Sequence, residues 1–358
     1  MTHIFVTGCP GAGKTTLARA LAPRLGLTLI CKDDIKEAIF DALDGPVGDL
    51  AFSDRVGSAS WEVLWALAGM FPRAMFEANF HPRNADERAR IRGLAGEVLE
   101  IHCACAPELA RRRYAARAAT PDRHRAHAVL ALTDDHLAIY DQPLGIGEPL
   151  IVDSSGPVDV DAVAATARRR FGLPAAHVDT ARRAVLMSGY PASGKTTLGY
   201  DLARALGFGL VSKDFVLDII FQAMEYQPGD FVASLRSGRA AWAVFWLMAR
   251  AARDVVLDSN IKPMQPDERG QAATLPCVVI DVHCRCPRDL VRRRYSDRAA
   301  ANPRPALRTH EITDERLSQY DGDLGQRRRV VVDTSIAVDL ADVVARVNRE
   351  FADAAACP

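Results

Sequence analysis

The chain has 358 residues, which gives room for two domains that each bury a hydrophobic core. Its 45 lysine and arginine residues balance 45 aspartate and glutamate residues, so no overall positive charge attracts nucleic acid or an anionic membrane, although a local basic groove is still compatible with this composition. Hydrophobic residues make up 49%, and no apolar run reaches the roughly 18 residues of a membrane span, which excludes a disordered chain and predicts no membrane contact.

The N-terminal segment goes directly into an apolar strand at residues 4–7 and has none of the basic and apolar regions of a secretion signal. We therefore expect a cytoplasmic protein. Several of the eight cysteines lie in apolar runs, so we expect reduced thiols rather than a disulfide framework.

A glycine-rich loop of the pattern GxxxxGK[ST] follows this first strand. It reads GCPGAGKTT from Gly8 to Thr16, and it recurs as GYPASGKTT from Gly189 to Thr197, both times between an apolar strand and a helical pattern. In this context backbone N–H groups bind phosphates, the lysine reaches the β- and γ-phosphates, and the following hydroxyl ligates magnesium. The alternative is an accidental glycine turn, which two copies disfavour. The pattern predicts two sites for ATP and Mg²⁺ that contain Gly8, Gly11, Ala12, Gly13, Lys14, Thr15 and Thr16, and Gly189, Ala192, Ser193, Gly194, Lys195, Thr196 and Thr197.

The second loop is one point of an internal duplication. At a constant offset of 181 residues the chain repeats several motifs, and after one deletion the offset becomes 180. The repeat predicts an N-terminal domain at 1–172, a linker at 173–181 and a C-terminal domain at 182–358. The pairs include Lys32-Asp33 with Lys213-Asp214, Asn79 with Asn260, Arg111–Tyr114 with Arg292–Tyr295, and Val152-Asp153 with Val332-Asp333.

Short apolar runs alternate with helical patterns in each half, which is typical of an α/β fold with a parallel sheet covered by helices. In such sheets the ligand binds at the carboxyl ends of the strands. The expected strands are Ile4–Thr7, Thr28–Cys31, Ala74–Ala78, Val98–Ala104 and Leu150–Val152, then Ala184–Ser188, Leu210–Ser212, Asp254–Asp258, Val278–Arg285 and Val330–Val332.

The second strand of each half ends in Lys-Asp, at Asp33 and Asp214. A carboxylate at this strand end faces the γ-phosphate and can accept the proton of an attacking hydroxyl, so we favour a catalytic base over the alternative, a helix N-cap. Lys36 follows one helical turn later, whereas Leu217 stands at its place in the second half. The two acceptor pockets are therefore expected to differ.

The third strand of each half ends in FEANF or LDSNI. Glu77 and Asp258 can hold magnesium through water, and Asn79 and Asn260 can orient the phosphate or the acceptor. A solvated strand end is the alternative.

Four tryptophans and two cysteine motifs are expected to serve the core. The tryptophans occur at i and i+4 in SWEVLWAL and AWAVFWLM, which favours a buried helical stripe over an aromatic wall for an acceptor. In HCAC and HCRC, strand alternation separates His102 from Cys103 and Cys105, which disfavours a shared zinc ion.

Arginine-rich segments follow the fourth strand. RRRYAAR and RRRYSDR place Arg113 and Arg117, and likewise Arg294 and Arg298, one helical turn apart. Loops at 120–125 and 302–308 follow, so each segment resembles a lid whose arginines neutralise a transferring phosphoryl group and exclude water. The alternative is a set of solvated arginines.

These motifs resemble a family, the P-loop kinase-like, AAA-type ATP-binding proteins, which are relatives of phage polynucleotide kinase, chloramphenicol phosphotransferase and zeta toxin. The resemblance covers nearly all of each half and rests on GxPxxGKTT, the strand-end Lys-Asp, [ED]-x-N, RY-x-x-R and Val-Asp-[ST]. It implies two tandem nucleoside-kinase-like domains, each with a five-stranded parallel sheet flanked by helices and an arginine-rich helical lid, with ATP and magnesium as donor and a hydroxyl as acceptor. Leu217 and the RHRAH segment at 123–127 depart from the family pattern. The residues that match its catalytic positions are Lys14, Lys195, Asp33, Asp214, Arg113, Arg117, Arg294 and Arg298.

The sequence favours a kinase that transfers the γ-phosphate of ATP to a hydroxyl of a small molecule such as a sugar, a nucleoside or an antibiotic. A polynucleotide 5′-hydroxyl kinase is an alternative, which zero net charge and the lack of a basic stripe interleaved with aromatic residues disfavour. A nucleotide-gated switch is a second alternative, and the two strand-end aspartates argue against it. The sequence does not indicate an oligomeric state.

Overall fold

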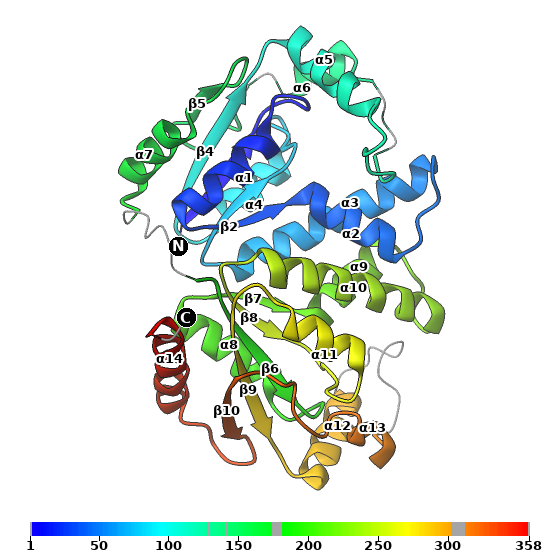
Figure 1. The fold of residues 1–358 in the computed structure, drawn as a ribbon. Coiled ribbons are helices and arrows are strands. Elements are labelled where there is room, and N and C mark those ends of the chain that lie inside the picture. Colours follow the sequence, from blue (N-terminus) through cyan, green and yellow to red (C-terminus); the bar gives the residue numbers. More distant parts are fainter. Residues whose placement is uncertain are drawn as a thin grey trace. The chain divides into compact units, whose positions relative to one another are not determined.

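The computed structural model of the chain describes residues 2–127, 129, 131–140, 142–173, 181–301 and 312–356. The chain divides into two compact units, residues 1–180 and 181–358, which we call the first and the second unit (Figure 1). Most of the predicted linker, residues 174–180, lies outside the described residues, so the domain bounds 1–172 and 182–358 stay a prediction.

The first unit is built on a parallel sheet, which within the described residues has five strands in the order β2-β3-β1-β4-β5. Helices connect the strands. Its elements are β1 (Thr2–Thr7), α1 (Lys14–Leu25), β2 (Thr28–Cys31), α2 (Lys32–Ala42), α3 (Leu50–Met70), β3 (Arg73–Glu77), α4 (Ala85–Arg92), β4 (Glu97–Ala104), α5 (Pro107–Ala118), α6 (Asp134–Ile139), β5 (Leu150–Asp153) and α7 (Val160–Phe171).

The second unit repeats this architecture. In the part of the chain that the structure describes, its parallel strands have the order β7-β8-β6-β9-β10, which corresponds strand by strand to the first sheet. Its elements are β6 (Arg183–Gly189), α8 (Lys195–Leu206), β7 (Gly209–Ser212), α9 (Lys213–Ala223), α10 (Phe231–Ala251), β8 (Asp254–Asp258), α11 (Pro266–Ala273), β9 (Val278–Arg285), α12 (Arg288–Ala301), α13 (Asp314–Ser318), β10 (Arg328–Asp333) and α14 (Leu340–Ala356).

The structure confirms the predicted fold of two five-stranded parallel sheets flanked by helices. Every predicted strand is present, with bounds within two residues of the expected ones. Continuous apolar runs specify these strands well because both faces of a parallel sheet are buried.

Alternation along β1 shows how the first sheet buries both faces. Ile4 and Val6 point to the face that α1 covers, where they form a core with Leu21. Phe5 points to the other face and stacks on Phe76 of β3 with ring centroids 5.2 Å apart. A sheet fixed from both sides is a rigid platform for residues at its strand ends.

The carboxyl ends of the central strands lie at one edge of each sheet. Cys31 at the end of β2 pairs with Glu77 at the end of β3, and Ser212 pairs with Asp258 at the same place in the second unit. The register therefore brings together the polar motifs that follow the strands. In the described residues, none of the helices combines the length and the apolar character that a membrane span requires.

Candidate active site

The P-loop of each unit approaches the backbone of a neighbouring strand very closely. Gly8 has φ +127°, and a Cβ there would lie 2.5 Å from the carbonyl oxygen of Cys103 in β4. Gly189 has φ +122°, and its Cβ would lie 2.5 Å from the carbonyl oxygen of Cys284 in β9. Any side chain would therefore push the loop away from the sheet, so both loops require glycine at this position.

The lysine of each P-loop is folded back over its own loop. Lys14 Nζ donates to the carbonyl of Cys9 at 3.0 Å, and Lys195 Nζ donates to the carbonyls of Gly189 at 3.1 Å and Tyr190 at 2.7 Å. Both lysines are about 5% exposed or less, and burial lowers the pKa of Lys195. Because a phosphate oxygen is a stronger acceptor than a carbonyl, each ammonium group can exchange its loop contacts for a bound phosphate.

A hydroxyl and a carboxylate meet directly behind each P-loop. Thr15 Oγ1 donates to Glu77 Oε2 at 3.1 Å, and Thr196 Oγ1 donates to Asp258 Oδ2 at 2.9 Å. The aspartate in the second unit thus takes the place of the glutamate in the first. The strand-end carboxylate is buried in both units, which contradicts the alternative of a solvated strand end for Glu77 and Asp258.

A second donor from the neighbouring strand orients each carboxylate. Cys31 Sγ donates to Glu77 Oε2 at 2.9 Å, and Ser212 Oγ donates to Asp258 Oδ2 at 3.0 Å. Burial raises the pKa of the Cys31 thiol well above its usual value, so it stays a protonated donor. Burial also raises the pKa of Asp258, while Lys195 acts in the opposite direction.

This pair of oxygen ligands fits magnesium. Mg²⁺ prefers oxygen, keeps several waters and takes its other ligands from nucleotide phosphates, so one hydroxyl and one carboxylate suffice on the protein side. The described residues hold no group of three or more His, Cys, Asp or Glu side chains that would bind a metal ion by themselves. Thr15 with Glu77, and Thr196 with Asp258, are the residues that would hold the ion.

The two strand-end aspartates stand at the entrance of the site. Because α2 begins at Lys32 and α9 at Lys213, each aspartate is the second residue of its helix, and the predicted alternative of an N-cap is wrong. The side chain of Asp33 is 47% exposed and 3.8 Å from Lys32 Nζ, and that of Asp214 is 38% exposed and 3.1 Å from Lys213 Nζ. Each carboxylate is thus accessible to an acceptor beside an ammonium group.

In the second unit one cavity joins these groups. It has a volume of about 520 Å³. Asn260 Nδ2 donates to Asp214 Oδ2 at 3.5 Å across it, whereas Asn79 of the first unit is half-buried two residues after the end of β3. The predicted residues that line the cavity are Ala192, Gly194, Lys195, Thr196, Thr197, Asp214, Asn260, Arg294 and Arg298.

The lid arginines of the first unit face two different partners. Arg113 donates to the carbonyls of Ser154 at 2.7 Å and Ser155 at 3.0 Å, in the loop after β5. The guanidinium of Arg117 lies 5.5 Å from the ring centroid of Tyr114. Arg113, in the middle of α5, thus contacts the loop after β5, and Arg117, in the last turn, contacts the helix itself.

Comparison with known families identifies both halves of the chain in the same way. Residues 4–143 and residues 185–322 each match the model of one family, which is described as an AAA domain. Together these matches span more than half of the chain. The chain belongs to the AAA domain family. A search of curated proteins gave no match.

Solved structures similar to this tandem AAA domain protein each cover about half of it. A protein from Chloroflexus aurantiacus, named only provisionally as a kinase, is 29% identical, covers 47% of this chain and 97% of its own, and has a TM-score of 0.42. A gluconokinase from Sinorhizobium meliloti is 17% identical over 49% of this chain and 94% of its own, with a TM-score of 0.32. A shikimate kinase from Acinetobacter baumannii is 19% identical over 48% and 93%, with a TM-score of 0.34.

The lid loop of the first AAA domain packs on helix α2. His124 Nε2 lies 3.1 Å from Asp41 Oδ2, Arg125 donates to Asp41 Oδ1 at 3.0 Å, and His127 Nε2 lies 2.8 Å from Glu37 Oε1. Burial raises the pKa of Asp41, but the hydrogen bonds from His124 and Arg125 lower it, so that the pKa lies below its usual value. The sequence indicated a lid at 120–125 but not its partners on α2. The corresponding loop of the second domain, 302–308, lies outside the described residues.

The tryptophans are less buried than the sequence predicted. Trp246 is buried, but Trp61, Trp65 and Trp242 are half-buried, so the buried stripe that the sequence favoured is complete at one of the four positions and partial at three. Lys32 Nζ lies 5.8 Å from the ring centroid of Trp61, and the second AAA domain repeats this contact at 5.7 Å. In each unit a tryptophan ring therefore makes a cation–π contact with the lysine that precedes the strand-end aspartate.

The cysteine motifs serve the core, as predicted. Cys103 is buried below the P-loop with Cys105 packed partly against the same core. His102 points to the other face of the sheet, where its Nδ1 lies 3.0 Å from Thr7 Oγ1. The cysteines and the histidine therefore do not share a metal site.

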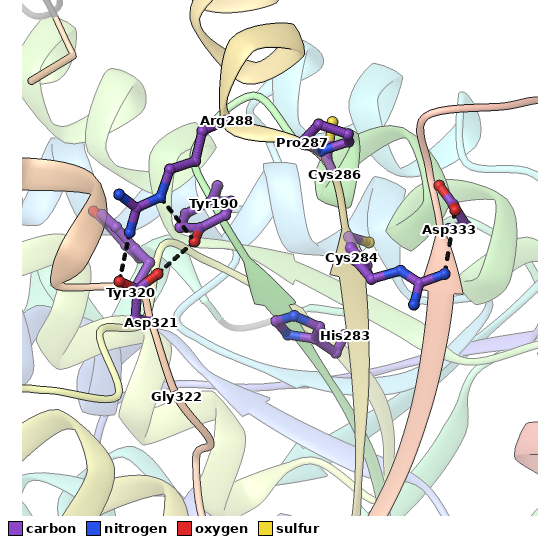
Figure 2. A pocket seen from close by; sticks show the side chains of 11 residues that line it. Tyr190, His283, Cys284, Cys286, Pro287, Arg288, Tyr320, Asp321, Gly322 and Asp333 are labelled. Atoms are coloured by element: carbon purple, nitrogen blue, oxygen red, sulfur yellow. Dashed lines mark hydrogen bonds and ion pairs between the residues drawn. The ribbon is translucent and has the colours of Figure 1, made fainter. Parts of the chain in front are cut away.

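A second cavity, of about 450 Å³, lies beside the P-loop of the second AAA domain (Figure 2). At one side of it the Tyr190 hydroxyl donates to the carboxylate of Asp321, and Arg288 donates to Tyr190 Oη at 3.3 Å and to Asp321 Oδ2 at 2.5 Å. These contacts connect the P-loop with the first residue of helix α12. This cluster was not predicted from the sequence. The signal for it in the sequence is that Tyr190 and Arg288 of the second half replace Cys9 and Pro107 of the first half.

Proposed function

We propose that this protein is an ATP-dependent kinase that transfers the γ-phosphate of ATP to a hydroxyl group of a small molecule, such as a sugar, a nucleoside or an antibiotic. The observation that carries this proposal is the cavity of the second unit, where the P-loop residues Lys195 and Thr196 share one space with Asp214, Arg294 and Arg298. A donor site and an accessible carboxylate side by side are what phosphoryl transfer to an alcohol requires.

Each group of residues has its own role in the proposed reaction. The P-loop N–H groups and Lys14 or Lys195 bind the β- and γ-phosphates, and Mg²⁺ held by Thr15 with Glu77 or by Thr196 with Asp258 would supply charge neutralisation there. Asp33 or Asp214 accepts the proton of the acceptor hydroxyl. The acceptor oxygen forms its bond to the γ-phosphorus as the bond from that phosphorus to the β–γ bridging oxygen breaks, and ADP leaves. The lid arginines stabilise the charge on the transferring group.

Burial and exposure support these roles. The loop lysines and the magnesium-binding carboxylates are almost completely buried, where electrostatic contacts are strong, whereas the side chains of Asp33 and Asp214 are 47% and 38% exposed. A base must reach an incoming acceptor, and a phosphate clamp must exclude water.

The direct test is transfer of labelled γ-phosphate from ATP to a panel of sugars, nucleosides, hydroxylated antibiotics and oligonucleotides with free 5′ hydroxyls. Wild type, Lys14→Ala and Lys195→Ala are compared. We expect magnesium-dependent label on a small molecule, with a loss of about 100-fold or more in the unit whose lysine is removed.

Each other result has a definite meaning. Label on oligonucleotides supports a polynucleotide kinase instead, and ATP hydrolysis that no acceptor stimulates supports a nucleotide-gated switch. Failure of the wild-type chain to bind ATP contradicts the proposed role of both P-loops.

A further inference from the structure

Two thiols of the first unit lie where the P-loop meets strand β4. Gly8 lies directly against the backbone of Cys103, and Cys9 and Cys105 follow this contact by one and two residues. Both belong to the core on the α1 side of the sheet, Cys9 as a buried member and Cys105 packed partly against it. Neighbouring strands are about 4.8 Å apart, so residues at such positions fall within the range of Cα separations that a disulfide bond requires.

The electrostatics of these thiols show that they are neighbours. Burial raises the pKa of the Cys9 thiol, the charge of Lys14 lowers it, and a thiolate at Cys105 raises it again. Burial raises the pKa of Cys103 to about 12, and thiolates at Cys9 and Cys105 add to this rise. Because the thiolate is the reactive form, Cys103, which is 1% exposed, is the least suited of the three to react.

Cys105 is the thiol of this group that an oxidant can reach. It is half-buried, whereas Cys9 and Cys103 are buried. Arg113 Nη1 donates to Cys105 Sγ at 3.8 Å. A guanidinium group stabilises negative charge on a sulfur atom as it attacks, and accessible thiols beside such a group are the ones that peroxides oxidise first.

The second unit keeps one half of this pair. Cys286 corresponds to Cys105, and Arg294 Nη1 donates to its sulfur at 3.7 Å. Tyr190 stands at the place of Cys9, packs against the core cluster that contains Cys286, and lines the same cavity (Figure 2). The two positions are therefore neighbours in the second unit as well, with a phenol in place of the P-loop thiol.

We propose that Cys9 and Cys105 are a peroxide-sensitive pair that forms a disulfide bond and thereby weakens nucleotide binding by the first unit alone. The Cys105 sulfur attacks one oxygen of hydrogen peroxide, the O–O bond breaks, and the thiol becomes a sulfenic acid as one water leaves. The Cys9 sulfur then attacks the sulfenic sulfur, the S–O bond breaks, and a second water leaves with the Cys9 proton as the S–S bond forms. The peroxide is reduced and the two thiols are oxidised, so a dithiol reductant reverses the change.

The disulfide bond would act on the P-loop through Cys9. The carbonyl of Cys9 accepts from Lys14 Nζ at 3.0 Å and from the backbone amide of Ala12 at 3.1 Å. A bond from the Cys9 side chain to the end of β4 therefore restricts the movement by which Lys14 exchanges this carbonyl for a phosphate. The effect on ATP rests on the proposed kinase function, whereas the disulfide bond itself does not.

The first experiment detects the bond itself. The full chain is treated with hydrogen peroxide, free thiols are blocked, and tryptic peptides are analysed by mass spectrometry without reduction. We expect residues 1–14 linked to residues 93–111, with a mass two hydrogen atoms below the sum of the two peptides. The link should persist in Cys103→Ser and disappear in Cys105→Ser, which distinguishes the two thiols of the second peptide. No link in the wild type, or a link that survives in Cys105→Ser, overturns the proposal.

The second unit supplies the matched control. Tyr190→Cys gives its P-loop a thiol beside Cys286, so peroxide should link residues 184–195 to residues 286–288 in this variant. Cys284 lies in a separate tryptic peptide, so the partner is identified directly. The unfolding midpoint shows whether the variant is folded. A folded variant that forms no such link counts against the proximity of these two positions as the cause of the bond.

The second experiment measures the effect on each P-loop. ATP binding is titrated before and after peroxide in the Lys195→Ala chain, which reports on the first unit, and in the Lys14→Ala chain, which reports on the second. We expect peroxide to weaken binding by the first unit about tenfold or more, the value of a hydrogen bond between the lysine and a phosphate, and dithiothreitol to restore it. Cys105→Ser should prevent the loss, and the second unit should keep its affinity. An equal loss in both units overturns the proposal.

The two experiments separate two failures. A peroxide-dependent link in a chain that binds no ATP even when reduced contradicts the kinase function and leaves the thiol pair in place. ATP binding that stays unchanged although the link forms contradicts the control of the P-loop by the thiol pair and leaves the kinase function in place.

Discussion

The two P-loops of this chain share their interior but differ in what surrounds them. Behind each loop, a threonine and a second donor hydrogen-bond a strand-end carboxylate, which is Glu77 in one unit and Asp258 in the other. Around the loops the contacts differ. The first unit has a lid loop that packs on α2 through His127, whereas the second has a P-loop connected to its lid helix through Tyr190.

This difference shows which parts of a duplicated site tolerate change. The proposed donor chemistry needs one arrangement, because the same nucleoside triphosphate and metal ion would bind to both copies. The acceptor side carries Lys36 in one unit and Leu217 in the other. The two units therefore differ where the acceptor would bind, and the comparison predicts that they use the same donor with two different acceptors.

The largest expected effect removes the base from either unit. Asp33→Asn in a Lys195→Ala chain, and Asp214→Asn in a Lys14→Ala chain, should each reduce phosphoryl transfer about 100-fold, since a positioned general base is worth at least that factor. ATP affinity should change little. Steady-state transfer and nucleotide binding measure the two quantities, and full transfer by either variant would remove the aspartate from the mechanism.

The next effect concerns a buried cluster that both units contain below the P-loop. In the second unit, Ser188 hydrogen-bonds both Asp281 and His283. Burial raises the pKa of Asp281 to about 6 and lowers that of His283 to about 4. The contribution of Asp281 to the free energy of unfolding falls as pH rises from about 4 to 6, because this carboxyl group ionises more easily in the unfolded chain. The contribution of His283 falls as pH decreases from 6.5 to 4, because this imidazole is protonated more easily in the unfolded chain. The two effects therefore oppose each other.

Asp281→Asn should expose the effect of the histidine alone. We expect the free energy of unfolding of the variant to fall by on the order of 2 kcal/mol between pH 6.5 and pH 4, while the wild type changes less. Urea unfolding at a series of pH values measures it. Glu100→Gln tests the corresponding cluster of the first unit, where burial shifts the pKa of Glu100 and of His102 in the same directions. Parallel pH profiles of variant and wild type would refute this account.

A smaller effect breaks the connection between Tyr190, Arg288 and Asp321 in the second unit. Tyr190→Phe removes the hydroxyl that contacts Arg288 and Asp321, so we expect ATP binding in a Lys14→Ala chain to weaken about fivefold, the value of one hydrogen bond. Cys9→Ala in a Lys195→Ala chain is the matched control and should have little effect. Equal affinities of Tyr190→Phe and its parent would show that the cluster does not position the P-loop.

The smallest effect concerns the lid of the first unit. Asp41→Gln places there the residue that the second unit has at Gln222, and it removes the ion pairs with His124 and Arg125. Because the Asp41 side chain is 54% exposed, these pairs are worth less than about 1 kcal/mol. Hydrogen exchange of residues 120–127 should therefore become less than about fivefold faster. A large acceleration would mean that Asp41 alone holds the lid.

The strands and the P-loops were predictable because their signals are local. An apolar run followed by glycines and Lys14-Thr15 contains its own context within sixteen residues, and the repeat at Lys195-Thr196 doubles it. The strand-end carboxylates were also found from the sequence, since parallel strands align their ends. Their burial and their hydrogen bonds to Thr15 and Thr196 came only from the structure.

The contacts that distinguish the units were not predictable, because they join residues far apart in the sequence. Tyr190 and Asp321 are 131 residues apart, and His124 and Asp41 are 83 apart. No spacing rule links such positions. The tryptophan stripe was misjudged for a related reason, since its period indicates a helix face but not that Lys32 stands over Trp61.

The contact of Gly8 with Cys103, and of Gly189 with Cys284, is one of backbone against backbone. It places each P-loop against the sheet through backbone atoms alone, without any side chain between them. The next residue in each loop differs between the units, since Cys9 packs in the core whereas Tyr190 hydrogen-bonds Asp321. A cysteine in one unit and a tyrosine in the other are therefore both compatible with the same close approach of the loop to the sheet.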